Sequence, residues 1–295
     1  MRTPWTGRVG LLGVPALAAL ALAGGCGGDD SDAAQRPVPV PKVDRFDARA
    51  AYRHLRAQVE LGPRPAGSAA SRRLARRLRG ELPRGRFEPV AGGLRNVVGT
   101  VPGRDRARKA IVAAHYDTKD IPGFVGANDG ASGTAVVTEL ARTIRPRELQ
   151  PTVVFLLFDG EESPAGAPDD QFERYGLRGS KAAAPRHDDA EAMILLDFVG
   201  ERGLRLPRES YSDERLWRRL RAAARAVGAG RVFPAGVQGG ILDDHVPFLR
   251  RGVPAIDLID FDFPCWHRRC DDLSVISVRS LDAVGESVYE LLRRL

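Results

Sequence analysis

The pattern of hydrophobic and polar positions predicts strands and helices in alternation. Continuous apolar runs are typical of buried strands, and the chain has three of them, at residues 110–114, 152–158 and 192–196. Shorter apolar segments predict further strands at residues 96–101 and 254–259. Apolar residues at helical spacing predict helices at residues 48–59, 68–82, 134–144, 212–227 and 280–292, with Ser68 and Ser212 as candidate N-caps.

The order of these elements predicts the fold class. Because continuous apolar strands are buried on both faces, the alternation indicates a largely parallel sheet with helices on both sides. No internal repeat and no long linker occurs after residue 45, and 295 residues suffice for one large domain. We therefore expect a single α/β domain at residues 46–295, with a central, mostly parallel mixed sheet flanked by helices on both faces.

Composition and charge exclude some classes of protein. Lys and Arg outnumber Asp and Glu by 45 to 38, which gives a net charge of +7, and 43% of the residues are hydrophobic. This hydrophobic fraction excludes global disorder. A nucleic-acid-binding protein would interleave basic and aromatic side chains, and the sequence has no such stripe. The charge therefore indicates an arginine-rich, solvated surface, and nucleic acid is not an expected partner.

The N-terminal segment has the features of a targeting signal. Arg2 and Arg8 precede an apolar run at residues 9–23, which is short for a membrane span and is followed by small residues. This order predicts a secretory signal peptide at residues 1–25. Residues 22–26 resemble a bacterial lipobox with one additional glycine, so Cys26 is the candidate lipidation site. An ordinary signal peptide followed by an unmodified cysteine is the alternative.

Residues 26–45 are rich in Gly, Asp, Ser and Pro, which suits a flexible, lipid-anchored tether. We therefore expect an exported lipoprotein, held by an N-terminal lipid on the outer face of the cytoplasmic membrane. An exported protein meets an oxidising compartment, so Cys265 and Cys270 form a candidate disulfide. Two free thiols are the alternative, because the spacing of the cysteines does not establish a bond.

Acidic and histidine residues occur where the predicted strands end. In chain order these residues are His115, the pair Glu161 and Glu162, and Asp197. Ligand sites of open α/β sheets lie outside the carboxyl ends of the strands, so these side chains should lie close together. Asp129, in a glycine-rich turn, and His267, beyond the last strand, are candidates for the same site.

Histidines and carboxylates in one place are typical of a metal site. Nitrogen and carboxylate oxygen ligands suit Zn²⁺, and a catalytic zinc keeps one position open for water or substrate. On an extended segment, Glu161 and Glu162 point in opposite directions. One of them can therefore bind the metal while the other transfers protons.

Several motifs together resemble those of the M28 family of zinc peptidases, and more narrowly its glutaminyl cyclase branch. The resemblance covers about residues 46–295. Its motifs lie at residues 61–68, 115–119, 124–129, 158–162, 195–197, 243–254 and 266–267. It implies a zinc-exopeptidase-like fold and an enzyme that acts on the N-termini of peptides or proteins.

The resemblance also implies a role for each candidate ligand. Asp129, Glu162 and His267 would bind the principal zinc, and Glu161 would be the general base or acid. In the aminopeptidases of the family, residues like His115 and Asp197 bind a second zinc, and the residue like Asp129 bridges the two ions.

In the cyclases of the family a single zinc suffices. Residues at the positions of Asp197 and Asp244 then share a proton network with the catalytic glutamate. The chain has the ligands for both arrangements, so the resemblance leaves open whether one or two Zn²⁺ ions bind.

The motifs also leave two reactions open. The long segment at residues 163–175, the doublet Asp243–Asp244 and the tryptophan beside His267 resemble the cyclases. Residues 130–133 resemble the aminopeptidases, residues 163–175 lack the tryptophan of the animal cyclases, and Asp257 replaces a histidine of those enzymes. We predict cyclisation of N-terminal glutamine to pyroglutamate with release of ammonia. Hydrolysis of N-terminal residues by an aminopeptidase is the alternative.

Two further alternatives concern single residues. Trp266 is the candidate substrate-binding residue, although it could instead only pack over the zinc ligand. An inactive binding protein would have lost Glu161 or a zinc ligand, and the sequence retains all of them.

Overall fold

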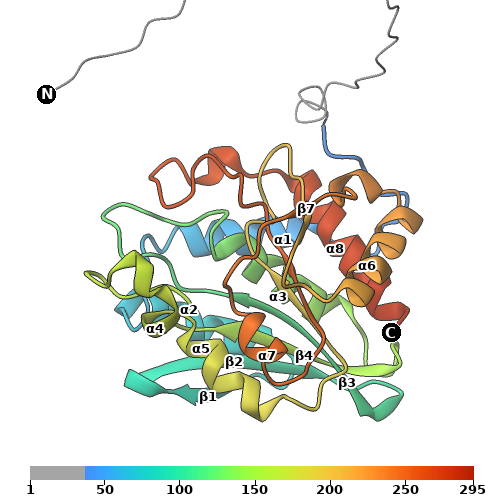
Figure 1. Ribbon diagram of the computed structural model, residues 1–295, viewed down its shortest axis with the longest axis horizontal. Coiled ribbons are helices and arrows are strands. Elements are labelled where there is room, and N and C mark those ends of the chain that lie inside the picture. The colour runs from blue at the N-terminus through green and yellow to red at the C-terminus, as the bar shows by residue number, and fades with distance from the viewer. Residues whose placement is uncertain (1–36) are drawn as a thin grey trace, which may run out of the picture.

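The computed structural model describes residues 37–295 (Figure 1). The signal peptide predicted at residues 1–25 and the candidate lipidation site Cys26 lie outside the described residues. Among residues 37–295, no helix has both the length and the apolar character needed to cross a membrane.

A six-stranded mixed sheet forms the centre of the fold, in the order β1-β2-β4-β3-β5-β8. Strands β3, β4, β5 and β8 are parallel to one another, whereas β2 runs antiparallel to both β1 and β4. The bounds are β1 Arg86–Val90, β2 Leu94–Val101, β3 Asp105–His115, β4 Pro151–Phe158, β5 Ala192–Leu196 and β8 Ala255–Leu258. The predicted α/β class, with its mostly parallel mixed sheet, is confirmed.

Helices cover both faces of this sheet. The longer ones are α1 Ala48–Val59, α2 Ala69–Glu81, α3 Ala131–Thr143, α6 Glu214–Ala226 and α8 Val278–Arg293. The shorter ones are α4 Phe172–Tyr175, α5 Arg178–Ala183 and α7 Val246–Leu249. Two short strands, β6 Arg208–Glu209 and β7 Val237–Gln238, pair separately from the main sheet. Single turns of 3-10 helix occur at Ala91–Gly93, Asp169–Gln171, Ala184–Arg186, Gly230–Val232 and Leu273–Val275.

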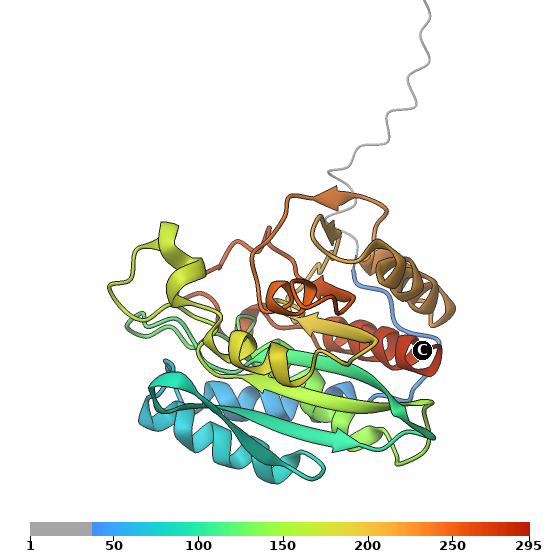
Figure 2. The same cartoon turned by 60° about the horizontal axis from the view of Figure 1, so that its bottom comes forward.

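Alternation along the strands divides the core into two layers. On β3, Val112 and Ala114 belong to the larger hydrophobic cluster, which includes residues of α1, α2, α3, α6 and α8. Ile111 and Ala113 point to the other face, where the smaller cluster includes residues of α5 and α7. Helices α1 and α8, from opposite ends of the chain, lie next to each other on the first face (Figure 2).

Side chains cap helices α1, α2 and α6, and the cap of α1 is the carboxylate of Asp47. The hydroxyl of Ser68 accepts a hydrogen bond from the amide of Ser71 and caps α2 as predicted. For α6 the cap is Asp213 rather than Ser212, since the Asp213 carboxylate accepts from the amide of Leu216 at 2.7 Å. The Ser212 hydroxyl instead accepts from the amide of Asp257, on β8.

The end of the predicted tether belongs to the folded body. Val38 is buried, and the amide of Lys42 donates to the carbonyl of Val227 at 2.8 Å. The Glu286 carboxylate of α8 accepts from the amides of Arg45 and Phe46. Residues 37–45 of the predicted tether therefore pack against the domain, because this segment buries an apolar side chain and makes backbone hydrogen bonds.

Candidate metal centre

The parallel strands bring the predicted site residues together at one edge of the sheet. His115 is the last residue of β3, Glu161 and Glu162 lie just beyond β4, and Asp197 follows β5. Asp129 lies in the turn before α3. His267 lies in the loop between β8 and α8.

Two groups of three potential ligands form within this edge. One group is His115, Asp129 and Asp197, and the other is Asp129, Glu162 and His267. Within each group the ligand atoms lie within 4.8 Å of one another. Asp129 belongs to both groups, which is the arrangement that the resemblance to the aminopeptidases implies for a principal and a second metal.

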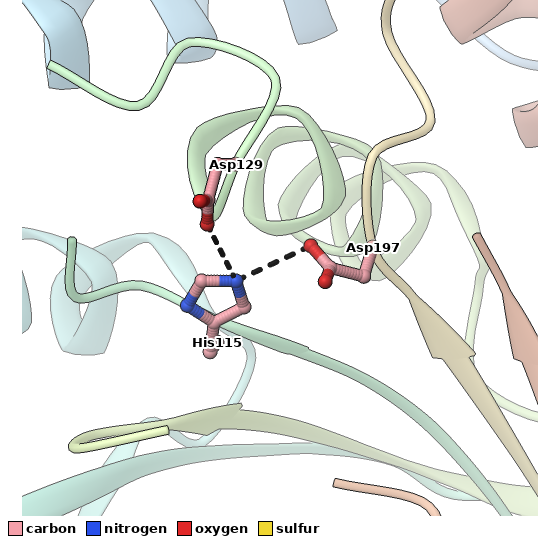
Figure 3. Close-up of side chains that lie close together, drawn as sticks. All are labelled: His115, Asp129 and Asp197. Atoms are coloured by element: carbon pink, nitrogen blue, oxygen red, sulfur yellow. Dashed lines mark hydrogen bonds and ion pairs between the residues drawn. The ribbon is translucent and has the colours of Figure 1, made fainter. Parts of the chain in front are cut away.

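The first group is almost completely buried. His115 Nε2 lies 3.3 Å from Asp129 Oδ1 and 3.2 Å from Asp197 Oδ1 (Figure 3). Burial raises the pKa of Asp197 to about 7, against the opposing effect of His115.

The second group, Asp129, Glu162 and His267, lines a cavity that is described below. His267 Nε2 lies 3.0 Å from Glu162 Oε1 and 3.5 Å from Asp129 Oδ2. The ammonium of Lys119 lies 3.2 Å from Glu162 Oε2. Within residues 37–295, Asp129 Oδ2 is a buried carboxylate oxygen that accepts no hydrogen bond. Such an oxygen, beside an imidazole and a second carboxylate, fits Zn²⁺ as a ligand set.

The backbone around these ligands is held by a buried carboxylate. Asp117, two residues beyond β3, accepts hydrogen bonds from the amides of Gly160, Glu161 and Glu162 at 3.0–3.2 Å. Gly160 has a φ of 77°, which favours glycine, and a Cβ there would lie 2.8 Å from Leu94 Cδ1. This turn therefore fixes where the two adjacent glutamates point.

The two glutamates titrate differently. Burial raises the pKa of Glu161 well above its usual range, and the charge of Glu162 adds to this effect. Burial also acts on Glu162, but the hydrogen bond from His267 and the charge of Lys119 outweigh it, so the pKa of Glu162 is lowered. Adjacent carboxyl groups whose pKa values are separated in this way can take the roles of ligand and proton carrier.

A cavity of about 360 Å³ opens over the ligands. Carboxylates form its floor, and its walls include Phe172, Phe198, Phe261 and Trp266. Trp266 is 43% exposed. Its ring stacks on the His267 imidazole, with the two centroids 4.6 Å apart. Trp266 thus lines the cavity, as a substrate-binding residue would, and it also packs over the candidate ligand His267.

The two aspartates before His245, Asp243 and Asp244, take different positions in the structure. Asp243 lines the cavity, whereas the predicted network residue Asp244 is fully buried and is not part of the cavity wall. The sequence singled out the doublet, but adjacent residues of a turn point in different directions. Asp243 is therefore the member of the pair that faces the cavity, whereas the charges of both Asp243 and Asp244 act on Glu161.

Other wall residues were missed by the sequence analysis. Phe172 belongs to α4, within the long loop after Glu162, and Phe198 directly follows Asp197 with a φ of 47°. Phe261 stacks on Phe198 and also contacts the ring of Trp266. The position of Phe198 after a strand-end aspartate was the one available signal.

The predicted pairing of Cys265 with Cys270 is present in the structure, with their Cα atoms 5.4 Å apart. The bond encloses Trp266 and His267. It therefore lies at the rim of the metal centre.

A mostly parallel α/β sheet, with histidine and carboxylate side chains gathered at its carboxyl edge, has the architecture of a zinc-exopeptidase-like fold. Comparison with known proteins agrees with this class. The sequence model described as "Peptidase family M28" matches residues 96–292, and the chain belongs to this family.

The similar proteins include both glutaminyl cyclases and an aminopeptidase. The chain is 30% identical over 219 residues to a glutaminyl-peptide cyclotransferase of Bos taurus, a match that covers 61% of this chain and 60% of the bovine protein. It spans about three fifths of the length of such curated relatives. The solved structure of Porphyromonas gingivalis glutaminyl cyclase is 30% identical, with a TM-score of 0.75, and covers 85% of this chain and 99% of its own. A leucine aminopeptidase precursor from Bacteroides thetaiotaomicron is 27% identical, with a TM-score of 0.77, covering 87% of this chain and 100% of its own.

Proposed function

We propose that this protein is a zinc-dependent glutaminyl-peptide cyclotransferase, which converts an N-terminal glutamine to pyroglutamate and releases ammonia. The observation that carries the proposal is the aromatic-lined cavity over Glu161 and the candidate ligands Asp129, Glu162 and His267. Cyclisation is intramolecular, so an enzyme gains by orienting one small side chain and by excluding water. The similarity to glutaminyl cyclases from bacteria and animals supports the same reaction.

The residues of this chain divide the reaction between them. A zinc ion held by Asp129, Glu162 and His267 would polarise the γ-carbonyl of the glutamine side chain as a Lewis acid. Glu161 accepts the proton that the α-amine loses as its nitrogen bonds to the γ-carboxamide carbon. The same carboxyl group then donates this proton to the departing amide nitrogen, which leaves as ammonia. The aromatic walls orient the glutamine and limit the access of water.

Aminopeptidase activity remains the second candidate because a specific observation favours it. Both groups of three ligands are assembled around the shared Asp129, as a two-zinc site requires. The similarity to a leucine aminopeptidase precursor points the same way. We propose one principal zinc for the cyclase. The group with His115 and Asp197 is the candidate second site.

One experiment separates the two reactions. The purified protein is incubated with zinc and a short peptide that begins with glutamine, and the products are analysed by mass spectrometry. Loss of one ammonia molecule from an otherwise intact peptide supports the cyclase, whereas loss of the first residue supports the aminopeptidase. The same peptide beginning with alanine is the control, since a cyclase leaves it unchanged.

We further propose that the protein is exported and anchored through a lipid on Cys26, as the pattern of residues 1–26 indicates. Metabolic labelling with a fatty acid tests this proposal. Label should be incorporated into the protein and be absent from a Cys26→Ser variant. Equal labelling of the two proteins would exclude Cys26 as the site.

A further inference from the structure

A short disulfide-closed loop carries one metal ligand. Cys265 and Cys270 are bonded across five positions, and His267 lies inside the ring that they close. His267 has a φ of 52°, in the left-handed region that residues other than glycine seldom adopt. The loop must therefore be held in shape for the imidazole to face Glu162 and Asp129.

The residue directly after the loop holds a second ligand. Asp271 is fully buried, and its carboxylate accepts hydrogen bonds from the amides of Asn128 and Asp129 at 2.6 and 3.0 Å. Its carbonyl accepts from the amide of Ala127 at 3.2 Å. Through these three hydrogen bonds Asp271 fixes the turn that presents Asp129.

The turn at Asp129 has a second support that is independent of the loop. The fully buried guanidinium of Arg64 donates to the carbonyls of Val125 and Gly126 at 2.7 and 3.2 Å. Arg64 holds the beginning of the turn and Asp271 holds its end. Loosening Asp271 should therefore displace Asp129 without unfolding the turn.

The disulfide is accessible from solvent. Cys270 is exposed and Cys265 is partly exposed. This loop also contacts the neighbouring loop through the exposed hydrogen bond from Arg269 Nε to the carbonyl of Pro122, and through the Phe124 ring, which packs edge-to-face with the His267 imidazole. An external reductant can therefore reach the bond that closes the loop.

We propose that the Cys265–Cys270 disulfide is a redox-sensitive positioning element for the metal centre. In the oxidised protein it holds His267 and, through Asp271, Asp129 in the geometry that binds metal. A dithiol reductant transfers two electrons and two protons, so that the S–S bond becomes two thiols while the dithiol closes to its own disulfide. The reduced loop then binds metal more weakly. This inference rests on the metal site of the proposed function, but not on which reaction that site performs.

The test measures zinc affinity by competition with a chromophoric chelator. Four samples are compared: the oxidised protein, the protein reduced by an immobilised dithiol that is removed before zinc is added, the Cys265→Ser/Cys270→Ser variant, and Arg268→Ala. Arg268 is exposed in the same loop, so its variant is the matched control. Changes to residues that support metal ligands typically lower affinity by roughly 10- to 100-fold. We expect a loss of this size in the reduced protein and the serine variant, reversal on reoxidation, and no change in Arg268→Ala.

Other outcomes have distinct meanings. If the oxidised protein binds no zinc, the metal site of the proposed function fails. If it binds zinc, and either the reduced protein or the serine variant binds equally tightly, only the redox inference is overturned. The melting temperature of the metal-free forms separates a role in stability from positioning. The absorption spectrum of bound Co²⁺ provides a second readout, since displaced ligands change its intensity. Should the serine variant fail to fold, the reduced protein, which folded before reduction, still decides the question.

Discussion

His267 Nε2 lies 3.0 Å from Glu162 Oε1, although the two residues are 105 positions apart in the chain. The contact joins the loop after β8 to the segment after β4, and Asp129 meets both side chains from the turn before α3. The principal ligand set is thus assembled from three separate segments. Each segment contributes one ligand side chain, so each ligand can be replaced singly.

Glu161 is expected to carry the proton without holding the metal. Glu161→Gln removes the carboxylate but keeps the size of the side chain, so turnover should fall by about 10²- to 10⁴-fold while zinc content stays the same. Steady-state kinetics and metal analysis of the same preparation check this. Glu60→Gln, an exposed change far from the site, should match the wild type. Undiminished turnover of Glu161→Gln would remove Glu161 from the mechanism.

His267 is expected to be a ligand of the principal zinc. His267→Ala removes the only nitrogen of that group, and zinc affinity should fall by more than the roughly 10- to 100-fold typical of residues that merely support a ligand. Metal analysis after dialysis is the measurement. His187→Ala is the matched control, because His187 pairs with Glu88 away from the centre. Full zinc occupancy in His267→Ala would disprove the assignment.

Asp243 and Asp244 are expected to differ in their effect on turnover. Asp243→Asn changes a group on the cavity wall and should lower kcat by about 10-fold or more without loss of zinc. Burial raises the pKa of Asp244 well above its usual range, and this fully buried residue lies outside the cavity wall, so Asn, which has nearly the same size, is a close replacement. Asp244→Asn should therefore retain most activity. A larger loss of kcat in Asp244→Asn than in Asp243→Asn would instead support the role of Asp244 that the resemblance implies.

A pH-dependent contribution to stability is expected at His54, far from the metal. On α1, His54 Nδ1 lies 3.2 Å from Oε2 of Glu81, on α2, and His54 Nε2 lies 3.4 Å from Oε2 of Glu139, on α3. Hydrogen bonds to Glu139 and Glu81 raise the pKa of His54 from 6.5 to about 9. Because the folded pKa is above the unfolded one, the contribution is complete below pH 6.5 and disappears as the pH rises through about 9.

The measurement for His54 is the melting temperature against pH for the wild type and His54→Gln. The difference between the two proteins should be largest at the acidic end of this range and vanish above pH 9. A difference that stays constant across the range would show that His54 contributes by packing alone. Arg53→Gln, an exposed neighbour on α1, controls for a general effect of charge.

The sequence predicts those parts of the fold that a periodic pattern encodes. The apolar runs of β3, β4 and β5 identify buried strands because both faces of each are covered. β1 was missed, since Arg86 and Glu88 make it polar and Pro89 is tolerated only at a sheet edge. The short helices α5 and α7 were also missed, because one or two turns contain too little periodicity.

The sequence also predicts only some of the residues at the site. His115, Glu161, Glu162 and Asp197 follow from the rule that polar groups collect at the carboxyl ends of parallel strands. The role of His267 depended on resemblance, because its loop has no periodic pattern. The choice between Asp243 and Asp244, and the presence of Phe172 in the wall, depend on how loops pack in three dimensions. Local sequence does not encode that packing.

The packing of residues 37–45 on the domain has a consequence for the proposed lipid anchor. If Cys26 carries the proposed lipid, eleven positions separate it from residue 37, where the described fold begins. At 3.3–3.6 Å per residue, these 37 − 26 = 11 steps span at most about 40 Å. Peptide N-termini close to the lipid surface would then be the accessible ones, and those deeper in the surrounding space would be out of reach.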